Sequence, residues 1–298
     1  MEAATVSTAA ARPRTSRWRA LLPPFTFVTP PTALLVVFFL VPMAILAVIA
    51  FEWGPLSGSS GFTLSNFTSI IDDPLYRRVT ITTFEIATIA MLAQLVVAVP
   101  VAYVLAYKAG RFELPLLLMM VLADELNPMV RIYAWRMLLG REGIINSGLM
   151  SLGVIDHPID ALLFSKFAVI VVLSTSYVTY TVIPIYAAMK AINSGLFEAA
   201  RDLGAGWFTT FRRVLLPLIT PGIFVALLLV YIPLFTDFAS PTLVGGTSGY
   251  MLGQSVNDLV LESGNLNAGA ALSLMMLVAS ALFAVVAYKL AKIRQLDT

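Results

Sequence analysis

The sequence contains no cysteine and only one histidine, His157, among its 298 residues. The missing thiols exclude disulfide bonds and thiolate metal ligands, and a lone histidine argues against a histidine-based metal site. Charged residues make up only 12% of the chain, whereas soluble domains carry about 25%. These absences argue against a water-soluble globule and against an enzyme built on thiol or imidazole chemistry.

The chain consists largely of long apolar blocks. Hydrophobic residues make up 59% of it, and they come in blocks of roughly 20, the length that crosses a bilayer as a helix. In lipid only helices or closed barrels satisfy the backbone, and the alternation of barrel strands is absent. The sequence therefore predicts an all-α polytopic membrane protein with about six transmembrane helices. They are expected at Thr32–Phe51, Val79–Tyr107, Leu114–Leu139, Phe167–Met189, Leu218–Asp237 and Ala268–Ala291.

The first 20 residues differ from the rest. They are rich in Ala, Thr and Arg, and the apolar run after them is too long for a cleavable signal and is not followed by a small-residue cleavage site. We expect residues 1–20 to form a disordered cytoplasmic tail and residues 21–298 to form one transmembrane domain.

The third predicted span is interrupted at Asn127-Pro128. As one straight helix its 26 residues would be about 39 Å long, more than the ~30 Å hydrocarbon core. Proline disfavours helical geometry in the residue before it, and Asn followed by Pro is a good helix start. The pattern predicts two half-helices, Leu114–Glu125 and Met129–Leu139. A full span followed by a short helix on the outer surface fits the same residues equally well.

Lysine and arginine placement predicts the orientation. With both ends inside, 13 of the 19 basic residues fall on the inner side and 4 in outer loops, as the positive-inside rule requires. We therefore expect an inner-membrane protein with both termini cytoplasmic. The outer loops and spans hold 12 acids and 6 bases, a net charge of −6, and the inner side 5 acids and 13 bases, a net of +8. A negative outer face would attract a cation, although positive-inside bias alone would also produce it.

A polar, helix-favouring island lies between the fourth and fifth spans. It contains Glu198-Ala199-Ala200, then Gly204 six residues after the glutamate, and it ends in Leu216-Pro217. The two alanines allow close approach of another surface, Glu198 can accept charge-assisted hydrogen bonds, and Gly204 permits a sharp turn. An ordinary amphipathic cytoplasmic loop would share the triplet alone, but not the whole spacing.

This spacing resembles the cytoplasmic coupling loop of ABC-importer permeases, E-A-A-x3-G-x9-I-x-L-P, with Val214 in place of isoleucine. The resemblance implies a type I ABC-importer permease-like fold, with a coupling loop at about residues 190–217 that contains a coupling helix. It also implies that the chain is half of a pore and not an enzyme. Its expected partners are ABC ATPase subunits, a second, related permease subunit, a periplasmic solute-binding protein, a small-molecule solute and membrane lipid, with no nucleic acid. The chain has no G-x-x-x-x-G-K-[ST] phosphate loop, so no cofactor is expected in it, and ATP and Mg would be bound by the ATPase.

Three segments resemble the spermidine/putrescine branch of these permeases. They are the segment with Arg131, Trp135, Gly143 and Asn146, the segment Leu152–Ile159, and the segment Asp237–Gly246. The branch implies a small cationic cargo, although relatives that carry opines, ferric iron, thiamine or phosphonates keep those cargoes open. One departure is the acidic pair Asp124-Glu125, where the branch usually has uncharged polar residues.

Ionisable residues within spans are candidates for a substrate pathway. Each costs about 2.5–3.5 kcal/mol at a helix centre and so is seldom without a role. We hypothesise that some of the acids face the pore and meet a cationic substrate: Glu85, Asp124, Glu125 and Asp237. Pairing with Arg131 or Arg136 as an internal clamp is an equally good interpretation.

Two tyrosines of the fourth span, Tyr177 and Tyr180, could offer cation–π faces to such a substrate. Packing within the bundle is the commoner use of such residues.

Two other classes of protein compete with the permease interpretation. An ion-gradient secondary transporter usually shows an inverted repeat with paired broken helices, and the sequence shows one break and no matching half. A membrane enzyme would need clustered catalytic groups at one depth, and without cysteine or further histidines only the acids remain.

Overall fold

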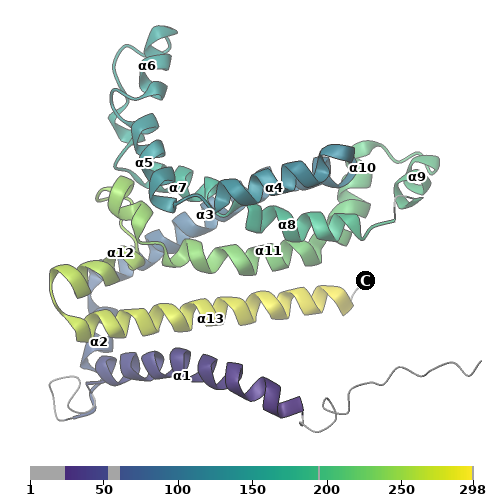
Figure 1. Ribbon diagram of the computed structural model, residues 1–298. Coiled ribbons are helices and arrows are strands. Elements are labelled where there is room, and N and C mark those ends of the chain that lie inside the picture. Colours follow the sequence, from purple (N-terminus) through teal and green to yellow (C-terminus); the bar gives the residue numbers. More distant parts are fainter. Residues whose placement is uncertain (1–23, 53–60, 194, 297–298) are drawn as a thin grey trace, which may run out of the picture.

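The structure is a computed structural model that describes residues 24–52, 61–193 and 195–296, and within these residues it is helical, with no strand (Figure 1). The tail expected at residues 1–20 lies outside the described residues. The α-helices are α1 (Pro24–Ala50), α2 (Ser65–Asp72), α3 (Pro74–Tyr107), α4 (Glu113–Asp124), α5 (Pro128–Leu139), α6 (Ile144–Ser151), α7 (Lys166–Thr175), α8 (Val178–Lys190), α9 (Gly195–Asp202), α10 (Trp207–Thr210), α11 (Leu216–Thr236), α12 (Leu252–Asn257) and α13 (Leu266–Leu296). Short 3-10 or π segments are η3 (Gly110–Phe112), η4 (Asp160–Leu162), η5 (Phe211–Leu215), η6 (Pro241–Gly245) and η7 (Asp258–Glu262).

Four stretches among the described residues are long and apolar enough to cross a membrane. They lie in α1, in α3, in the continuous run from α10 through α11, and in α13. The pair α7–α8 counts as a fifth span if its two helices are taken together. The all-α polytopic fold is therefore confirmed, and the predicted count of six spans is approximate.

The predicted third span is two helices. The chain breaks between α4 and α5, as expected at Asn127-Pro128, and the Asn127 side chain accepts a hydrogen bond from the Met129 amide at 2.9 Å. With 12 residues, α4 is about 18 Å long and is too short to be a full span by itself. Figure 1 shows α5 turning away from the bundle, so that α5 and α6 project from it as an arm.

The predicted fourth span needs a correction. Instead of one helix over Phe167–Met189, the chain forms α7 and α8, bent by 47° at Ser176 and Tyr177. Tyr177 adopts left-handed backbone angles, with φ 61°, which a helix cannot accommodate. The chain therefore has two broken helices where the sequence indicated only one.

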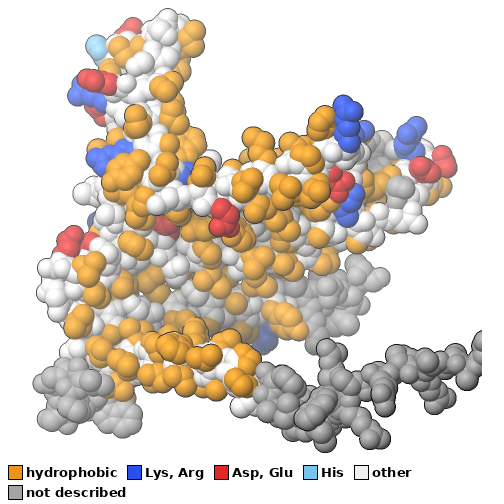
Figure 2. All heavy atoms as spheres, in the orientation of Figure 1, with side chains coloured by type: hydrophobic (Ala, Val, Ile, Leu, Met, Phe, Trp, Pro, Cys, Tyr) orange, Lys and Arg blue, Asp and Glu red, His pale blue; other side chains and the backbone are white. Residues whose placement is uncertain are grey.

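The bundle has two buried apolar clusters along its length. One includes Ile86, Leu173 and Phe235, and the other includes Ile185 and Ile219 near the start of α11. The second cluster lies at the end of the bundle where Figure 1 shows α9, α10, the beginning of α1 and the end of α13. The opposite end carries α2, α12 and the arm. Figure 2 shows most charged side chains near these two ends, with apolar surface between them.

Close packing of α8 on α11 depends on a glycine. Gly222 is buried, and a Cβ atom there would lie 2.7 Å from both the Ala188 Cβ and the Pro184 carbonyl oxygen. We expect Gly222→Leu to destabilise the folded protein by about 1–3 kcal/mol, because overpacking pushes the two helices apart. Thermal unfolding in detergent, followed by fluorescence-detected size exclusion, measures the effect. Gly148→Leu is the control, since nothing lies within 4 Å of its Cβ position. Equal unfolding temperatures for the two variants would contradict the prediction.

Candidate functional site

The coupling loop is fastened to the bundle by aromatic and polar contacts. Phe197 of α9 meets the ring of Tyr107 edge-on, with centroids 5.4 Å apart. The Tyr107 hydroxyl, at the end of α3, donates a hydrogen bond to the Met189 carbonyl at 2.7 Å. These contacts join α9 to the ends of both α3 and α8.

The other face of α9 is open. Glu198 and Ala199 are exposed, whereas Ala200 is buried. Gly204 has φ +76°, and its amide donates to the Arg201 carbonyl at 2.9 Å. A left-handed glycine just after a helix is the usual way to satisfy its last carbonyls, so Gly204 ends α9 as the sequence predicted.

After Ala205 and Gly206, the chain runs through α10 and η5 into α11 without a loop. Trp207 stacks on Phe211, with ring centroids 5.7 Å apart, and Leu215 is buried. Pro217 lies in the first turn of α11, where a proline costs no hydrogen bond. A displacement of α9 would therefore be passed directly to α8 on one side and α11 on the other.

The N-terminal end of α4 is tied to α8 close to this loop. The Tyr186 hydroxyl donates a hydrogen bond to Glu113, and the Lys190 ammonium lies 2.9 Å from the other carboxylate oxygen of Glu113. The hydrogen bond from Tyr186, followed by the contacts with Lys190, lowers the pKa of Glu113 below its ordinary value. Glu113 is thus ionised at neutral pH and holds the first turn of α4 against the last turns of α8.

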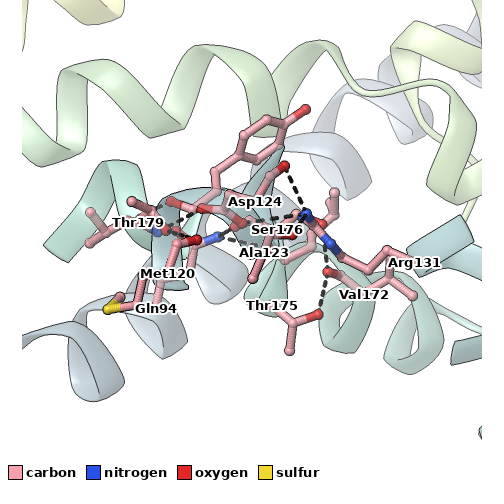
Figure 3. A network of polar contacts seen from close by, with 12 residues as sticks. Gln94, Met120, Ala123, Asp124, Arg131, Val172, Thr175, Ser176 and Thr179 are labelled. Carbon is pink, nitrogen blue, oxygen red and sulfur yellow. Dashed lines mark hydrogen bonds and ion pairs between the residues drawn. The ribbon is translucent and has the colours of Figure 1, made fainter. Parts of the chain in front are cut away.

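The C-terminal end of α4 is tied to α8 where the two broken helices meet (Figure 3). The Asp124 carboxylate accepts a hydrogen bond from the Thr179 amide at 2.9 Å, and the Thr179 hydroxyl donates to the Met120 carbonyl at 3.1 Å. The first amides of a helix have no partner within it, and Tyr177, which precedes α8, provides no side-chain cap. Asp124 therefore caps α8 from a different helix.

Arg131 completes this junction from α5. Its Nη2 atom lies 3.4 Å from Asp124 Oδ1 and donates to the Asp124 and Ala123 carbonyl oxygens at 3.2 and 3.4 Å. The two charged side chains are only 18% and 11% exposed. The guanidinium thus balances the carboxylate and also satisfies the last carbonyls of α4.

Gln94 of α3 holds the other side of the α7–α8 break. It is fully buried, its amide nitrogen donates to the carbonyls of Leu173 and Ser176, and its oxygen accepts from the Thr181 hydroxyl at 2.8 Å. A continuous helix would have used the Leu173 carbonyl for the amide of residue 177. We call Gln94, Asp124, Arg131 and Thr179 together the break junction.

Sequence reasoning missed Gln94, Thr179 and the second break. The available signal was the polar run Ser174-Thr175-Ser176 inside an apolar span. All three hydroxyls bond back to carbonyls of α7, a pattern that bends helices.

A cavity of about 560 Å³ lies beside this junction, at the C-terminal end of α11. Its lining includes Asn127 and Met129 at the start of α5, Tyr177 at the α7–α8 break, and Asp237 just after α11. Asp237 Oδ1 accepts a hydrogen bond from the Ser240 amide at 2.8 Å. Two of the predicted pathway residues, Tyr177 and Asp237, therefore share one cavity.

The remaining pathway candidates do not line it. Glu85 forms an ion pair with Lys166 at 2.7 Å, and Glu125 is exposed. Tyr180 is 46% exposed, with its ring 6.4 Å from that of Tyr177. The Asp124 carboxylate already accepts from the Thr179 amide and is paired with Arg131.

Comparison with known proteins identifies a family and named relatives. Residues 4–294 match the model of the family described as "binding-protein-dependent transport system inner membrane component". The spermidine/putrescine transport system permease protein PotB of Haemophilus influenzae is 32% identical over 87% of this chain and 91% of its own length. PotB of Escherichia coli K12 is 34% identical over 78% of this chain and 84% of its own length.

A solved structure supports the same fold. A chain in the crystal structure of a bacterial ABC transporter involved in the import of the acidic polysaccharide alginate superimposes with a TM-score of 0.71. The match covers 93% of this chain and 96% of that chain at 17% sequence identity.

The two roles of Asp124, cap and counter-ion, can be separated by substitution. Asn caps a helix about as well as Asp, so Asp124→Asn retains the acceptor for the Thr179 amide and loses only the charge. Asp124→Leu also leaves that amide unsatisfied and Arg131 unpaired. We expect Asp124→Leu to cost about 3–5 kcal/mol, the typical loss on breaking a buried pair, and Asp124→Asn to cost less. Thermal unfolding of the purified protein measures both, with Glu125→Leu as the exposed control. An Asp124→Leu protein as stable as the control would show that the junction does not hold the breaks.

Proposed function

The chain belongs to the binding-protein-dependent transport system inner membrane component family, and from this membership we propose that it is the permease subunit of an ATP-driven importer for a small cationic solute. It is a multi-pass inner-membrane transport subunit rather than an enzyme. Its helices would form half of the translocation pore, and the energy would come from ATP and Mg bound by separate ABC ATPase subunits.

The observation that carries the ATPase part of the proposal is the exposed face of α9. Glu198 and Ala199 point away from a helix whose other side is tied to α3 and α8 through Phe197. A small protruding helix with a carboxylate suits a groove on a partner. Its firm attachment lets a movement of that partner reach the transmembrane helices.

The remaining partners follow from the family and from the two ends of the bundle. Because the family belongs to binding-protein-dependent systems, we expect a periplasmic solute-binding protein to dock at the end opposite α9. A second, related permease subunit would complete the pore. The first helix begins, and the last helix ends, at the end that carries α9 (Figure 1). We place that end and both termini in the cytoplasm, because the positive-inside rule favours the same side.

The proposed cargo is a polyamine such as spermidine or putrescine. Support comes from sequence identity above 30% with two permeases named for these solutes. The fold by itself does not decide the cargo, since the alginate importer shares it and is named for an anionic polysaccharide. Opines, ferric iron, thiamine and phosphonates are not favoured by these relatives.

Two broken helices are also a feature of ion-gradient transporters, and the structure has the pair that the sequence did not reveal. Family membership nevertheless favours the ATP-driven importer. The test is uptake of radiolabelled spermidine into proteoliposomes that contain the purified complex. We expect uptake to require ATP inside and the binding protein outside. Uptake driven by an ion gradient without ATP would overturn the proposal.

Docking of the ATPase can be tested at Glu198. We expect Glu198→Ala to weaken binding of the ATPase subunit about 10- to 100-fold, because a hydrogen bond to a charged group contributes about 1.5–3 kcal/mol. Surface plasmon resonance with the immobilised permease measures the affinity. Glu142→Ala, an exposed glutamate in the arm, is the control. Equal affinities for the two variants would argue against α9 as the docking site.

The turn that ends α9 can be tested at Gly204. Valine at φ +76° is strained by roughly 1–2 kcal/mol, so Gly204→Val should displace α9 and lower ATP-dependent uptake. Gly206→Val is the matched control, because Gly206 has φ −68° and extended backbone, which valine readily adopts. Uptake that falls equally in both variants would mean that the loop tolerates no bulk, rather than that the turn matters.

A further inference from the structure

Charge balance singles out one acid among the pathway candidates. Glu85 is paired with Lys166, and Asp124 with Arg131. Glu125 faces the exterior. Asp237 lies at the cavity beside the break junction and forms no salt bridge with any of the described residues. A carboxylate in such a place requires a cation from elsewhere or a strong set of hydrogen bonds.

Hydrogen bonds hold Asp237 in place without neutralising it. The Ser240 amide donates to Oδ1 at 2.8 Å, and the Ala239 amide and Ser240 hydroxyl also donate to the carboxylate. These three donors are uncharged, and a carboxylate offers about four acceptor positions. The carboxyl group therefore has no charged partner among the described residues and has room for one more donor.

The cavity provides what an alkylammonium ion needs besides the carboxylate. Tyr177 lines the same space as Asp237, and a cation over a tyrosine face is stabilised. Apolar groups of Ile232, Pro233 and Phe238 also line the cavity and suit a methylene chain, beside the polar side chains of Asn127 and Thr236. The volume of about 560 Å³ falls within the range of small-molecule sites.

Arg131 is the nearby positive charge that could oppose a cation here. However, its guanidinium is paired with Asp124 and bonded to two carbonyls of α4. The ion pair in the break junction thus offsets the positive charge of Arg131, and Asp237 is the acid at the cavity without a basic partner among the described residues.

We propose that Asp237 and Tyr177 form a binding subsite for one ammonium group of the cargo, with the adjoining methylene groups against Ile232 and Phe238. Asp124, in contrast, is a positioning residue whose oxygens are used within the protein. This subsite rests on the cationic cargo of the proposed function. It lies at the outer end of α11, so the solute would reach it before passing the break junction.

Asp237→Asn tests the charge alone. The amide oxygen can still accept from the Ser240 amide, so the local fold is retained. In the reconstituted complex with its binding protein and ATPase, we expect KM for spermidine uptake to rise about 10- to 100-fold, the loss that matches one charged hydrogen bond. ATPase activity without solute should be unchanged. Glu125→Gln, an acid outside the cavity, is the control and should leave KM as it is.

The ring is tested independently with Tyr177→Leu and Tyr177→Phe. Phenylalanine keeps the aromatic face, so KM should rise severalfold only in the leucine variant. This pair decides the question if Asp237→Asn fails to assemble. A wild-type KM in both Asp237→Asn and Tyr177→Leu would overturn the subsite while leaving the importer intact. A wild-type complex that takes up neither spermidine nor putrescine would instead show that the proposed cargo is wrong.

Discussion

The rest of the structure depends on how the broken helices are satisfied. A helix that stops within a membrane exposes backbone amides and carbonyls that lipid cannot solvate. Asp124 accepts from the first turn of α8, Arg131 covers the last carbonyls of α4, and Gln94 takes the carbonyls at the end of α7. These polar side chains lie in the bundle because the breaks require them, and the breaks persist because the side chains are there.

The junction also makes α4 and α8 act as one unit. The two helices are tied at one end through Glu113 and Lys190 and at the other through Asp124 and Thr179. One end of this unit adjoins the coupling loop, and the other lines the cavity through Tyr177. An importer must join ATPase movement to solute access, and two helices fastened at both ends provide a short path of fixed length. A switch between two states of the importer would then lie in how the neighbouring helices pack against α4 and α8.

Fold and cargo are set by different parts of the chain. The helical bundle is shared with an alginate importer at 17% identity, so the arrangement of helices is compatible with solutes of either charge. In the proposed subsite, the charges that remain uncompensated around the cavity would determine which solute is stabilised. In this protein Arg131 is paired with Asp124, whereas Asp237 forms no salt bridge with the described residues and accepts from the uncharged Ser240 amide.

The sequence by itself determined the membrane-spanning helical class, the break at Asn127-Pro128 and the turn at Gly204. Each depends on local properties: the length of an apolar run, a proline after a cap, and a glycine after a helix. It did not predict the break at Tyr177, and it left open which acids were paired. Those outcomes were decided by contacts between residues far apart in the chain, such as Gln94 with Leu173 and Asp124 with Thr179. An acid in a span looks the same in the sequence whether it caps a neighbouring helix or faces a cavity, because only tertiary packing brings its partner within hydrogen-bonding distance.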